Sequence, residues 1–226
     1  MILFCIYVII ITVKKGEKTM NIYEHIDYTL LKATASYDDI YNLCEEANEK
    51  GCASVCIPSC YVPFVFDHCP AVTICTVVGF PLGNSSTDAK VAEAESAVYY
   101  GASEIDLVMN IALFKNGQKY AVKNEIERVR EAIGDDTILK VIIETCYLEE
   151  WEIESATRLV DSTSADYVKT STGFGTRGAS FEDIILMKKN VPNGTKIKAS
   201  GGIRTKEEMM KYIALGCDRI GASQLP

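Results

Sequence analysis

Histidine is scarce in this sequence, and the cysteines show no metal-binding pattern. The chain has two histidines, and none of its nine cysteines lies in a CxxC spacing. Zinc sites use closely spaced cysteine and histidine ligands, and the common serine triad needs a histidine base. We therefore expect no metal site and no histidine-based triad. An odd number of scattered cysteines is typical of a reducing compartment, which predicts a cytoplasmic protein without a disulfide framework.

Positive charge and linker-type sequence are also in short supply. The net charge is -8 at pH 7, which argues against a nucleic-acid-binding surface but leaves room for a local pocket that binds a small anion. The chain contains no Pro/Ser-rich run, charge block or low-complexity tract. With 48% hydrophobic residues, it suits a single domain with a substantial core.

A membrane-spanning run is missing as well. The apolar stretch ILFCIYVIIITV (residues 2–13) is shorter than the roughly 20 residues that a spanning helix needs, and it has neither a basic flank before it nor a small-residue cleavage site. A membrane anchor remains the alternative. We interpret residues 1–19 as an apolar extension outside the fold, residues 20–226 as one catalytic domain, and we expect no membrane partner.

From residue 25 onward, strand-like runs alternate with mostly amphipathic helical segments. Capping-box spacings predict three helix starts, at Ser36/Asp39, Ser180/Asp183 and Thr205/Glu208, whereas residues 61–69 make a poor helix. The strand-like runs are residues 25–31, 52–58, 72–79, 104–110, 138–145, 167–171, 196–200 and 219–223.

Eight strands joined by helices or short connections indicate parallel pairing through right-handed crossovers. This favours an α/β protein with a closed (β/α)8 barrel, the TIM barrel. An open doubly wound sheet of six or seven strands is the structural alternative. The sequence ends at Pro226, soon after the eighth run, so the last helix is expected to be shortened or missing.

Charged residues occur at inward positions of three predicted strands. In KIKAS, Lys196 and Lys198 share the face opposite the apolar residues, so both point into the barrel, with Lys198 nearer the C-terminal mouth. The same alternation points Lys169, Glu104 and Asp106 inward. Buried parallel strands are normally apolar, so these charges need a reason. One reason is a satisfied ion-pair network, and the other is chemistry.

Two lysines on neighbouring strands favour chemistry. At ~5 Å and an effective dielectric of ~20, two ammonium groups repel by roughly 3 kcal/mol, or about 2 pKa units. That repulsion would help to keep one of Lys169 and Lys198 as the free amine, while its neighbour stays cationic. A free amine attacks carbonyl carbon, so the pattern indicates Schiff-base catalysis at a barrel mouth.

At this point the sequence resembles the deoxyribose-phosphate aldolase family from about Ile22 to Ser223. The resemblance implies a (β/α)8 barrel that reversibly splits 2-deoxy-D-ribose 5-phosphate into D-glyceraldehyde 3-phosphate and acetaldehyde, without metal or cofactor, in deoxyribonucleotide catabolism. The motifs that carry it are IDYTLLKATAS, EIDLVMN, VKTSTGFG, KIKASGGIR and RIGAS.

The resemblance also implies roles for individual residues. Lys169 is expected to be the Schiff-base lysine, Lys198 the second lysine and Asp106 the proton donor or acceptor. Asp27 resembles a further member of this proton relay, although a hydrogen-bond acceptor at a strand end is the alternative.

Glycine-rich turns at the same end of the predicted barrel suggest where the phosphate binds. TIM barrels commonly bind phosphate in the loops after strands seven and eight, through backbone N–H groups. The candidate residues, which follow the sixth and seventh strands or lie in the eighth strand and its turn, are Thr172, Gly173, Gly201, Gly202, Gly221 and Ser223.

Other functions stay open on the sequence alone. The chain could be a different Schiff-base sugar-phosphate aldolase or a transaldolase, or a catalytically weak barrel that only binds sugar phosphates because its C-terminus is short. In each case the expected partner is a small sugar phosphate, and a homodimer is possible.

Overall fold

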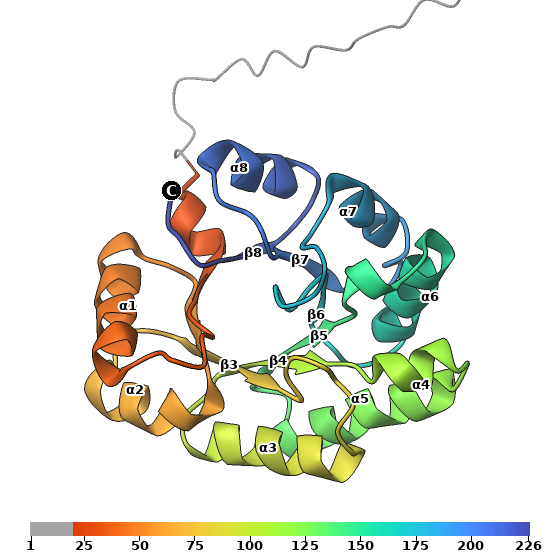
Figure 1. The fold of residues 1–226 in the computed structure, drawn as a ribbon, viewed down its shortest axis with the longest axis horizontal. Coiled ribbons are helices and arrows are strands. Elements are labelled where there is room, and N and C mark those ends of the chain that lie inside the picture. Colours follow the sequence, from red (N-terminus) through yellow and green to blue (C-terminus); the bar gives the residue numbers. More distant parts are fainter. Residues whose placement is uncertain (1–19) are drawn as a thin grey trace, which may run out of the picture.

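The computed structural model describes residues 20–226 as a closed barrel of eight parallel strands (Figure 1). The first strand pairs with both the second and the eighth, which closes the barrel and confirms the predicted fold. The strands are β1 (Ile26–Thr29), β2 (Ser54–Ile57), β3 (Ile74–Val78), β4 (Glu104–Val108), β5 (Ile138–Ile142), β6 (Tyr167–Lys169), β7 (Lys196–Ser200) and β8 (Arg219–Ala222).

Helices form a ring around this barrel (Figure 1). Two of them follow β4, and within residues 20–226 α8 is the last helix and precedes β8. The helices are α1 (Tyr37–Lys50), α2 (Val62–His68), α3 (Thr87–Tyr99), α4 (Ile111–Lys115), α5 (Lys119–Ile133), α6 (Glu150–Asp161), α7 (Phe181–Lys188) and α8 (Lys206–Ala214), with short 3-10 helices η1 (Ile22–His25), η2 (Ser59–Tyr61) and η3 (Thr145–Tyr147).

Local sequence signals explain most helix starts. Reciprocal capping-box hydrogen bonds form at the starts of α1, α7 and α8, as the sequence predicts. The expectation of a poor helix at residues 61–69 was wrong, because α2 forms there. Its proline lies in the first turn, where it costs no hydrogen bond, and Val62 and Val65 are fully buried against the core. Packing therefore outweighs the weak helical propensity of this segment.

The strands divide their side chains between two environments. On β4, Ile105 and Leu107 are fully buried and belong to the hydrophobic core, whereas the alternating Glu104 and Asp106 face the barrel interior, where they contact charged side chains. Lys196, predicted to point inward, lies at the opposite end of the barrel from the mouth and is exposed, with its ammonium 5.5 Å from the Tyr167 ring centroid.

Residues 1–19, interpreted from the sequence as an apolar extension, lie outside the described residues. Among residues 20–226, none of the helices is both long and apolar enough to cross a membrane.

Candidate active site

The carboxylate of Asp106 lies inside the barrel and contacts three lysine side chains. Its Oδ2 atom accepts hydrogen bonds from Lys169 Nζ at 2.6 Å and from Lys198 Nζ at 2.7 Å. Its Oδ1 atom accepts from Lys140 Nζ at 2.9 Å. All four side chains are buried. The strand register brings them together, since Lys169 is level with Lys198 across β6 and β7, and Asp106 is level with Lys140 across β4 and β5.

Asp27 joins this cluster from β1. Its carboxylate forms an ion pair with Lys198 on β7 and another with Arg219 on β8. The Oδ1 atom also accepts a hydrogen bond from Ser54 Oγ at 2.8 Å. The structure therefore places all four sequence-predicted catalytic candidates in one continuous network of charges.

Two cations of the network were not selected from the sequence. Lys140 Nζ lies 2.5 Å from Glu104 Oε2 and 2.9 Å from Asp106 Oδ1, and Arg219 lies 3.2 Å from Glu104 Oε1. A lysine inside the apolar run ILKVI was an available signal for Lys140. With these residues included, four basic side chains face three carboxylates, so the basic groups outnumber the acidic ones by one.

The electrostatics of this cluster differ from simple repulsion between two lysines. Burial alone would lower the pKa of Lys198, but Asp106 and Asp27 raise it above its usual value. Burial likewise acts to raise the pKa of Asp106, but Lys140, Lys169 and Lys198 hold it well below its usual range. Lys198 is thus an ammonium and Asp106 a carboxylate at neutral pH. The sequence predicted only repulsion between the two lysines. It did not predict that both amines would donate to one carboxylate oxygen, which offsets that repulsion.

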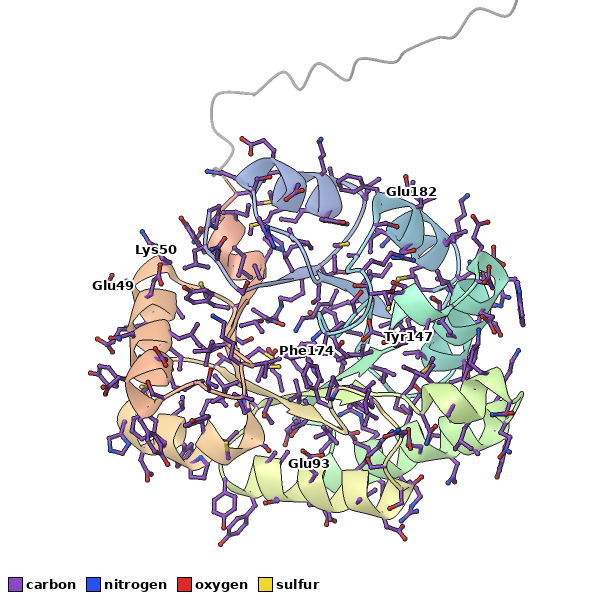
Figure 2. All side chains as sticks on the ribbon, in the orientation of Figure 1. Glu49, Lys50, Glu93, Tyr147, Phe174 and Glu182 are labelled. Atoms are coloured by element: carbon purple, nitrogen blue, oxygen red, sulfur yellow. The ribbon has the colours of Figure 1, made fainter. Side chains whose placement is uncertain are left out.

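Above the charged cluster, a cavity of about 330 Å³ opens at the mouth of the barrel and reaches Lys169. Two further cationic side chains, Lys32 and Arg204, line it and were not singled out from the sequence. Phe174 also lines it, and Figure 2 shows this ring over the centre of the barrel. The lining includes every residue that the sequence predicted for phosphate binding: Thr172, Gly173, Gly201, Gly202, Gly221 and Ser223.

Three of these glycines shape turns that other residues would strain. Gly173, Gly201 and Gly202 have φ angles of 86°, 87° and 76°, in the left-handed region that favours glycine. In the part of the chain that the structure describes, their backbone N–H groups donate to no protein acceptor. Unpaired N–H groups converging on a cavity form a typical anion-binding arrangement.

Gly221 has a different reason to be glycine. A Cβ atom on Gly221 would lie 2.3 Å from Ser200 Oγ and 3.4 Å from Lys198 Cε. The missing side chain therefore leaves room for the Ser200 hydroxyl, next to Lys198. Ser200 Oγ is itself buried without a hydrogen-bond partner within residues 20–226, and the residue lines the mouth cavity.

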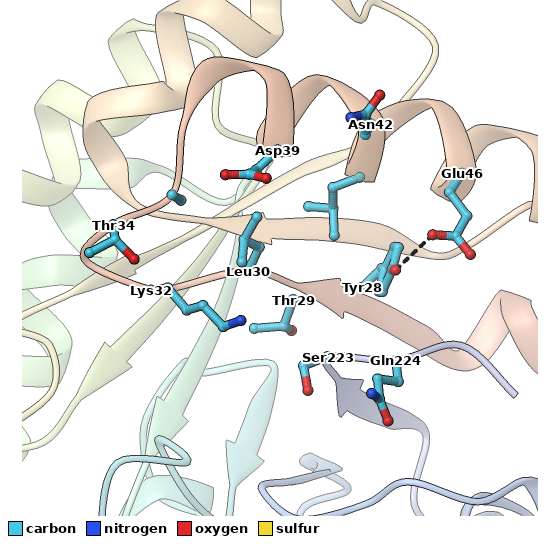
Figure 3. A pocket seen from close by; sticks show the side chains of 12 residues that line it. Tyr28, Thr29, Leu30, Lys32, Thr34, Asp39, Asn42, Glu46, Ser223 and Gln224 are labelled. Carbon is cyan, nitrogen blue, oxygen red and sulfur yellow. Dashed lines mark hydrogen bonds between the residues drawn. The ribbon is translucent and has the colours of Figure 1, made fainter.

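A second cavity of about 460 Å³ lies beside β1 and α1 (Figure 3). It shares Thr29, Leu30, Lys32 and Ser223 with the mouth cavity. One of its walls holds the hydrogen bond from the Tyr28 hydroxyl to Glu46 at 2.7 Å, drawn as a dashed line in Figure 3. No member of the lysine and aspartate cluster lines this second cavity, so the mouth cavity is the candidate active site.

Groups that could ligate a metal also occur in the interior. The ligand atoms of Cys56, Cys75 and Asp106 lie within 4.8 Å of one another. However, Cys75 Sγ is 3.3 Å from Lys140 Nζ, and Lys140 also donates to Asp106. A metal cation would have to displace or closely approach ammonium groups, so this set fits the ion-pair network better than a metal site.

Comparisons with known proteins identify the family of this chain. Residues 22–223 match the sequence model of the DeoC/LacD family aldolases. A deoxyribose-phosphate aldolase of Clostridium botulinum (strain Alaska E43 / Type E3) is 50% identical over 205 residues, which cover 90% of this chain and 92% of that protein. One from Treponema denticola is 48% identical over 207 residues, covering 90% and 96%.

Solved structures show the same fold. A putative deoxyribose-phosphate aldolase from Coccidioides immitis superposes with a TM-score of 0.87 at 41% identity, covering 93% of this chain and 85% of that one. A deoxyribose phosphate aldolase from Aeropyrum pernix, described as tetrameric, gives a TM-score of 0.83 at 30% identity, covering 89% and 86%. This chain belongs to the DeoC/LacD family of aldolases.

Proposed function

We propose that this protein is a deoxyribose-phosphate aldolase, a lyase that reversibly cleaves 2-deoxy-D-ribose 5-phosphate into D-glyceraldehyde 3-phosphate and acetaldehyde. The observation that carries the proposal is the pair of lysines sharing one oxygen of Asp106 beneath a cavity lined by unpaired backbone N–H groups. The names of the relatives point to the same substrate.

Lys169 is the proposed Schiff-base lysine. It alone of the three interior lysines lines the mouth cavity. Lys169 contacts one carboxylate, whereas Lys198 contacts two and Lys140 contacts three. Loss of a proton from Lys169 would therefore disrupt fewer ion pairs than loss of a proton from either of the others. The neutral amine adds to the open-chain aldehyde, and loss of water gives a cationic iminium.

The iminium then accepts the electron pair of the C2–C3 bond as that bond breaks. A base must remove the proton of the C3 hydroxyl, and the buried Asp106 carboxylate with the Lys198 ammonium forms the proposed relay, through a water molecule. Bond cleavage leaves an enamine on Lys169. Protonation at C2 and hydrolysis release acetaldehyde and restore the amine. Asp27 belongs to this relay because its carboxylate contacts the same Lys198 ammonium that contacts Asp106 Oδ2.

The proposed phosphate site lies at the rim of the same cavity. Backbone N–H groups of Gly173, Gly201 and Gly202 supply donors, and Lys32 and Arg204 supply positive charge. Gly221 and Ser223 complete the wall on the β8 side. This arrangement places a phosphate several bonds away from the aldehyde carbon that reaches Lys169, as the open-chain substrate requires.

The cellular setting is part of the proposal. Eight cysteines of residues 20–226 are free thiols, which supports a reducing compartment such as the cytoplasm. The partner is a small sugar phosphate, and a homodimer remains the proposed assembly.

A coupled assay tests the proposed activity. The enzyme is incubated with 2-deoxy-D-ribose 5-phosphate, and released glyceraldehyde 3-phosphate is followed through NADH-dependent reduction. In parallel, acetaldehyde and borohydride should leave a reduced ethyl adduct on Lys169, located by peptide mass spectrometry. Release of a different aldehyde would indicate another Schiff-base aldolase, and failure to form either product or adduct would reject the proposal.

A further inference from the structure

Glu144 combines two unfavourable features just beyond the end of β5. Its backbone has φ 53° and ψ 69°, and it is the one non-glycine residue with positive φ in the described part of the chain. Its side chain is 1% exposed, yet among residues 20–226 no lysine, arginine or histidine nitrogen lies within 4.0 Å of the carboxylate. A strained backbone and a buried carboxylate without a direct ion pair both cost stability, and such features concentrate at functional sites.

The hydrogen bonds of Glu144 lead directly to the mouth cavity. The backbone N–H of Thr172 donates to both carboxylate oxygens, at 3.3 and 3.2 Å, and the Thr172 hydroxyl donates to Oε2. Because the hydroxyl hydrogen is directed to Glu144, the hydroxyl oxygen is free to accept the N–H of Phe174 at 3.0 Å. These bonds fix the turn that holds Gly173, with its φ of 86°.

This turn packs closely against its surroundings. A Cβ on Gly175 would lie 2.4 Å from Cys146 Sγ and 3.3 Å from Glu144 Oε1, so the loop is wrapped tightly over Glu144. A Cβ on Gly201 would lie 3.4 Å from Gly173 Cα. The Gly173 and Gly201 turns therefore lie side by side. A shift of the Gly173 turn would change the distance between the two halves of the proposed phosphate site.

We propose that Glu144 is a positioning residue for the substrate phosphate: through Thr172 it holds the Gly173 turn in the shape that presents unpaired N–H groups to the anion. The inference rests on the proposed function and adds a residue that does not touch the substrate. It also changes the role of Thr172, which the sequence assigned to phosphate binding. Both donors of Thr172 are used by Glu144, so Thr172 shapes the site and leaves the N–H donation to the glycines.

Kinetics with two substrates test this role. In Glu144→Gln, the side chain loses its negative charge and one acceptor oxygen, and the amide nitrogen cannot accept from Thr172, so the hydrogen bonds to Thr172 weaken and the turn loosens. We expect KM for 2-deoxyribose 5-phosphate to rise about tenfold, the effect of weakened hydrogen bonds to a charged group, with kcat largely kept. The kcat/KM for unphosphorylated 2-deoxyribose should stay within about twofold of wild type, because that substrate does not use the phosphate site. Thr172→Val should give the same split, and the double variant should be no worse than either single variant.

The matched control is Glu149→Gln, which removes the charge of an exposed carboxylate in the same loop without touching Thr172. It should leave both kinetic constants unchanged. An equal fall with the two substrates, an unchanged KM, or additive effects in the double variant would overturn the inference. If Glu144→Gln does not fold, Thr172→Val decides by the same criteria.

Calorimetry with inorganic phosphate separates this inference from the proposed function. Wild type should bind phosphate, and Glu144→Gln should bind it about tenfold more weakly. If wild type failed to cleave 2-deoxyribose 5-phosphate, the proposed function would fall, but weaker phosphate binding by the variant would still support the role of Glu144. Equal phosphate binding by the two proteins would refute that role regardless of the cleavage result.

Discussion

Lys169 and Lys198 donate hydrogen bonds to the same oxygen atom of Asp106, at 2.6 and 2.7 Å. The two amines therefore lie no farther apart than the sum of these distances, on the same inner wall of the barrel. Their surroundings differ nevertheless. Lys198 is fully enclosed and has a second carboxylate, Asp27, whereas Lys169 opens to the mouth cavity. This difference supports the proposal that Lys169 is the nucleophile and Lys198 the acid.

Removing either lysine tests that assignment. Lys169→Ala should reduce cleavage of 2-deoxyribose 5-phosphate to background, because no other interior lysine lines the mouth cavity. Lys198→Ala should lower kcat by about 100- to 10,000-fold, the usual contribution of a positioned proton donor. Steady-state kinetics in the coupled assay measure both. The control is Lys196→Ala. Lys196 lies on β7, like Lys198, but is exposed, so this variant should behave like wild type.

Lys140 should matter for stability as well as for activity. Lys140→Met removes a cation that contacts Glu104 and Asp106 in the interior, leaving each of these buried carboxylates with fewer cationic partners. We expect a loss of about 3–5 kcal/mol in the free energy of unfolding, measured by urea denaturation. Lys123→Met breaks an exposed ion pair with Glu127 on α5 and should cost less than about 1 kcal/mol. Similar small losses in both variants would contradict a structural role for Lys140.

The depressed pKa values of Asp27 and Asp106 predict acid sensitivity. Lysine and arginine neighbours outweigh burial and hold both pKa values below the usual Asp value. Each group therefore contributes stability that is fully present above its unfolded pKa of about 3.9 and is lost as pH falls through its lower folded pKa. The free energy of unfolding should decrease as the solution is acidified below about pH 4.

Urea titrations between neutral and acidic pH check this dependence. Asp27→Asn should be less stable at neutral pH, since it leaves Lys198 and Arg219 with fewer partners. Its stability should also fall less steeply with acid than that of wild type, because one linked proton is missing. Parallel curves for the two proteins would show that Asp27 titrates normally.

Lys32 and Arg204 should bind the phosphate end of the substrate. Replacing either with methionine keeps most of the side-chain volume but removes the charge, and KM for 2-deoxyribose 5-phosphate should rise about tenfold or more. The rise should shrink when the wild-type and variant enzymes are compared at high salt, since screening already weakens the interaction. Lys206→Met, exposed at the start of α8, provides the control. An unchanged KM in both cavity variants would show that the phosphate does not bind near Lys32 and Arg204.

Gly221 offers a steric test of the lysine network. In Gly221→Ala, the methyl group would meet Ser200 Oγ at 2.3 Å, so overpacking should cost about 1–3 kcal/mol of stability and lower kcat by displacing Lys198. Adding Ser200→Ala should restore part of both losses, because it removes the nearest atom. The thermal midpoint and kcat of the single and double variants are the readouts. A double variant no better than Gly221→Ala would show that contact with Ser200 is not the cause.

Much of the barrel was predictable because its strands and helices follow local rules. The eight strand-like runs, the three capping boxes and the inward alternation at Asp106 and Lys198 depend on residues close together in the chain. The formation of α2 was not predictable in this way. Its stability comes from Val62 and Val65 packing on the core, a contact that propensity does not contain.

The missed site residues share a dependence on closure of the barrel. Arg219 meets Glu104 only because β8 returns to β1 and its side chain crosses the interior toward β4. Glu144, with its αL backbone, lies in the loop after β5, and its hydrogen-bond partner Thr172 lies in the loop after β6. Their contact likewise depends on the folded barrel. Lys140 is the exception, since a lysine within an apolar strand is a signal that the sequence itself contains.

The two ion pairs of Asp27 connect the first strand of the barrel to the last two. A growing chain on the ribosome can therefore hold Asp27 and Asp106 long before it holds Lys198 and Arg219. Until β7 and β8 emerge and β8 pairs with β1, the proposed reaction centre is incomplete and its amines lack their final surroundings. Enzymatic activity of this protein therefore requires that the eighth strand has been synthesised and that the barrel has closed.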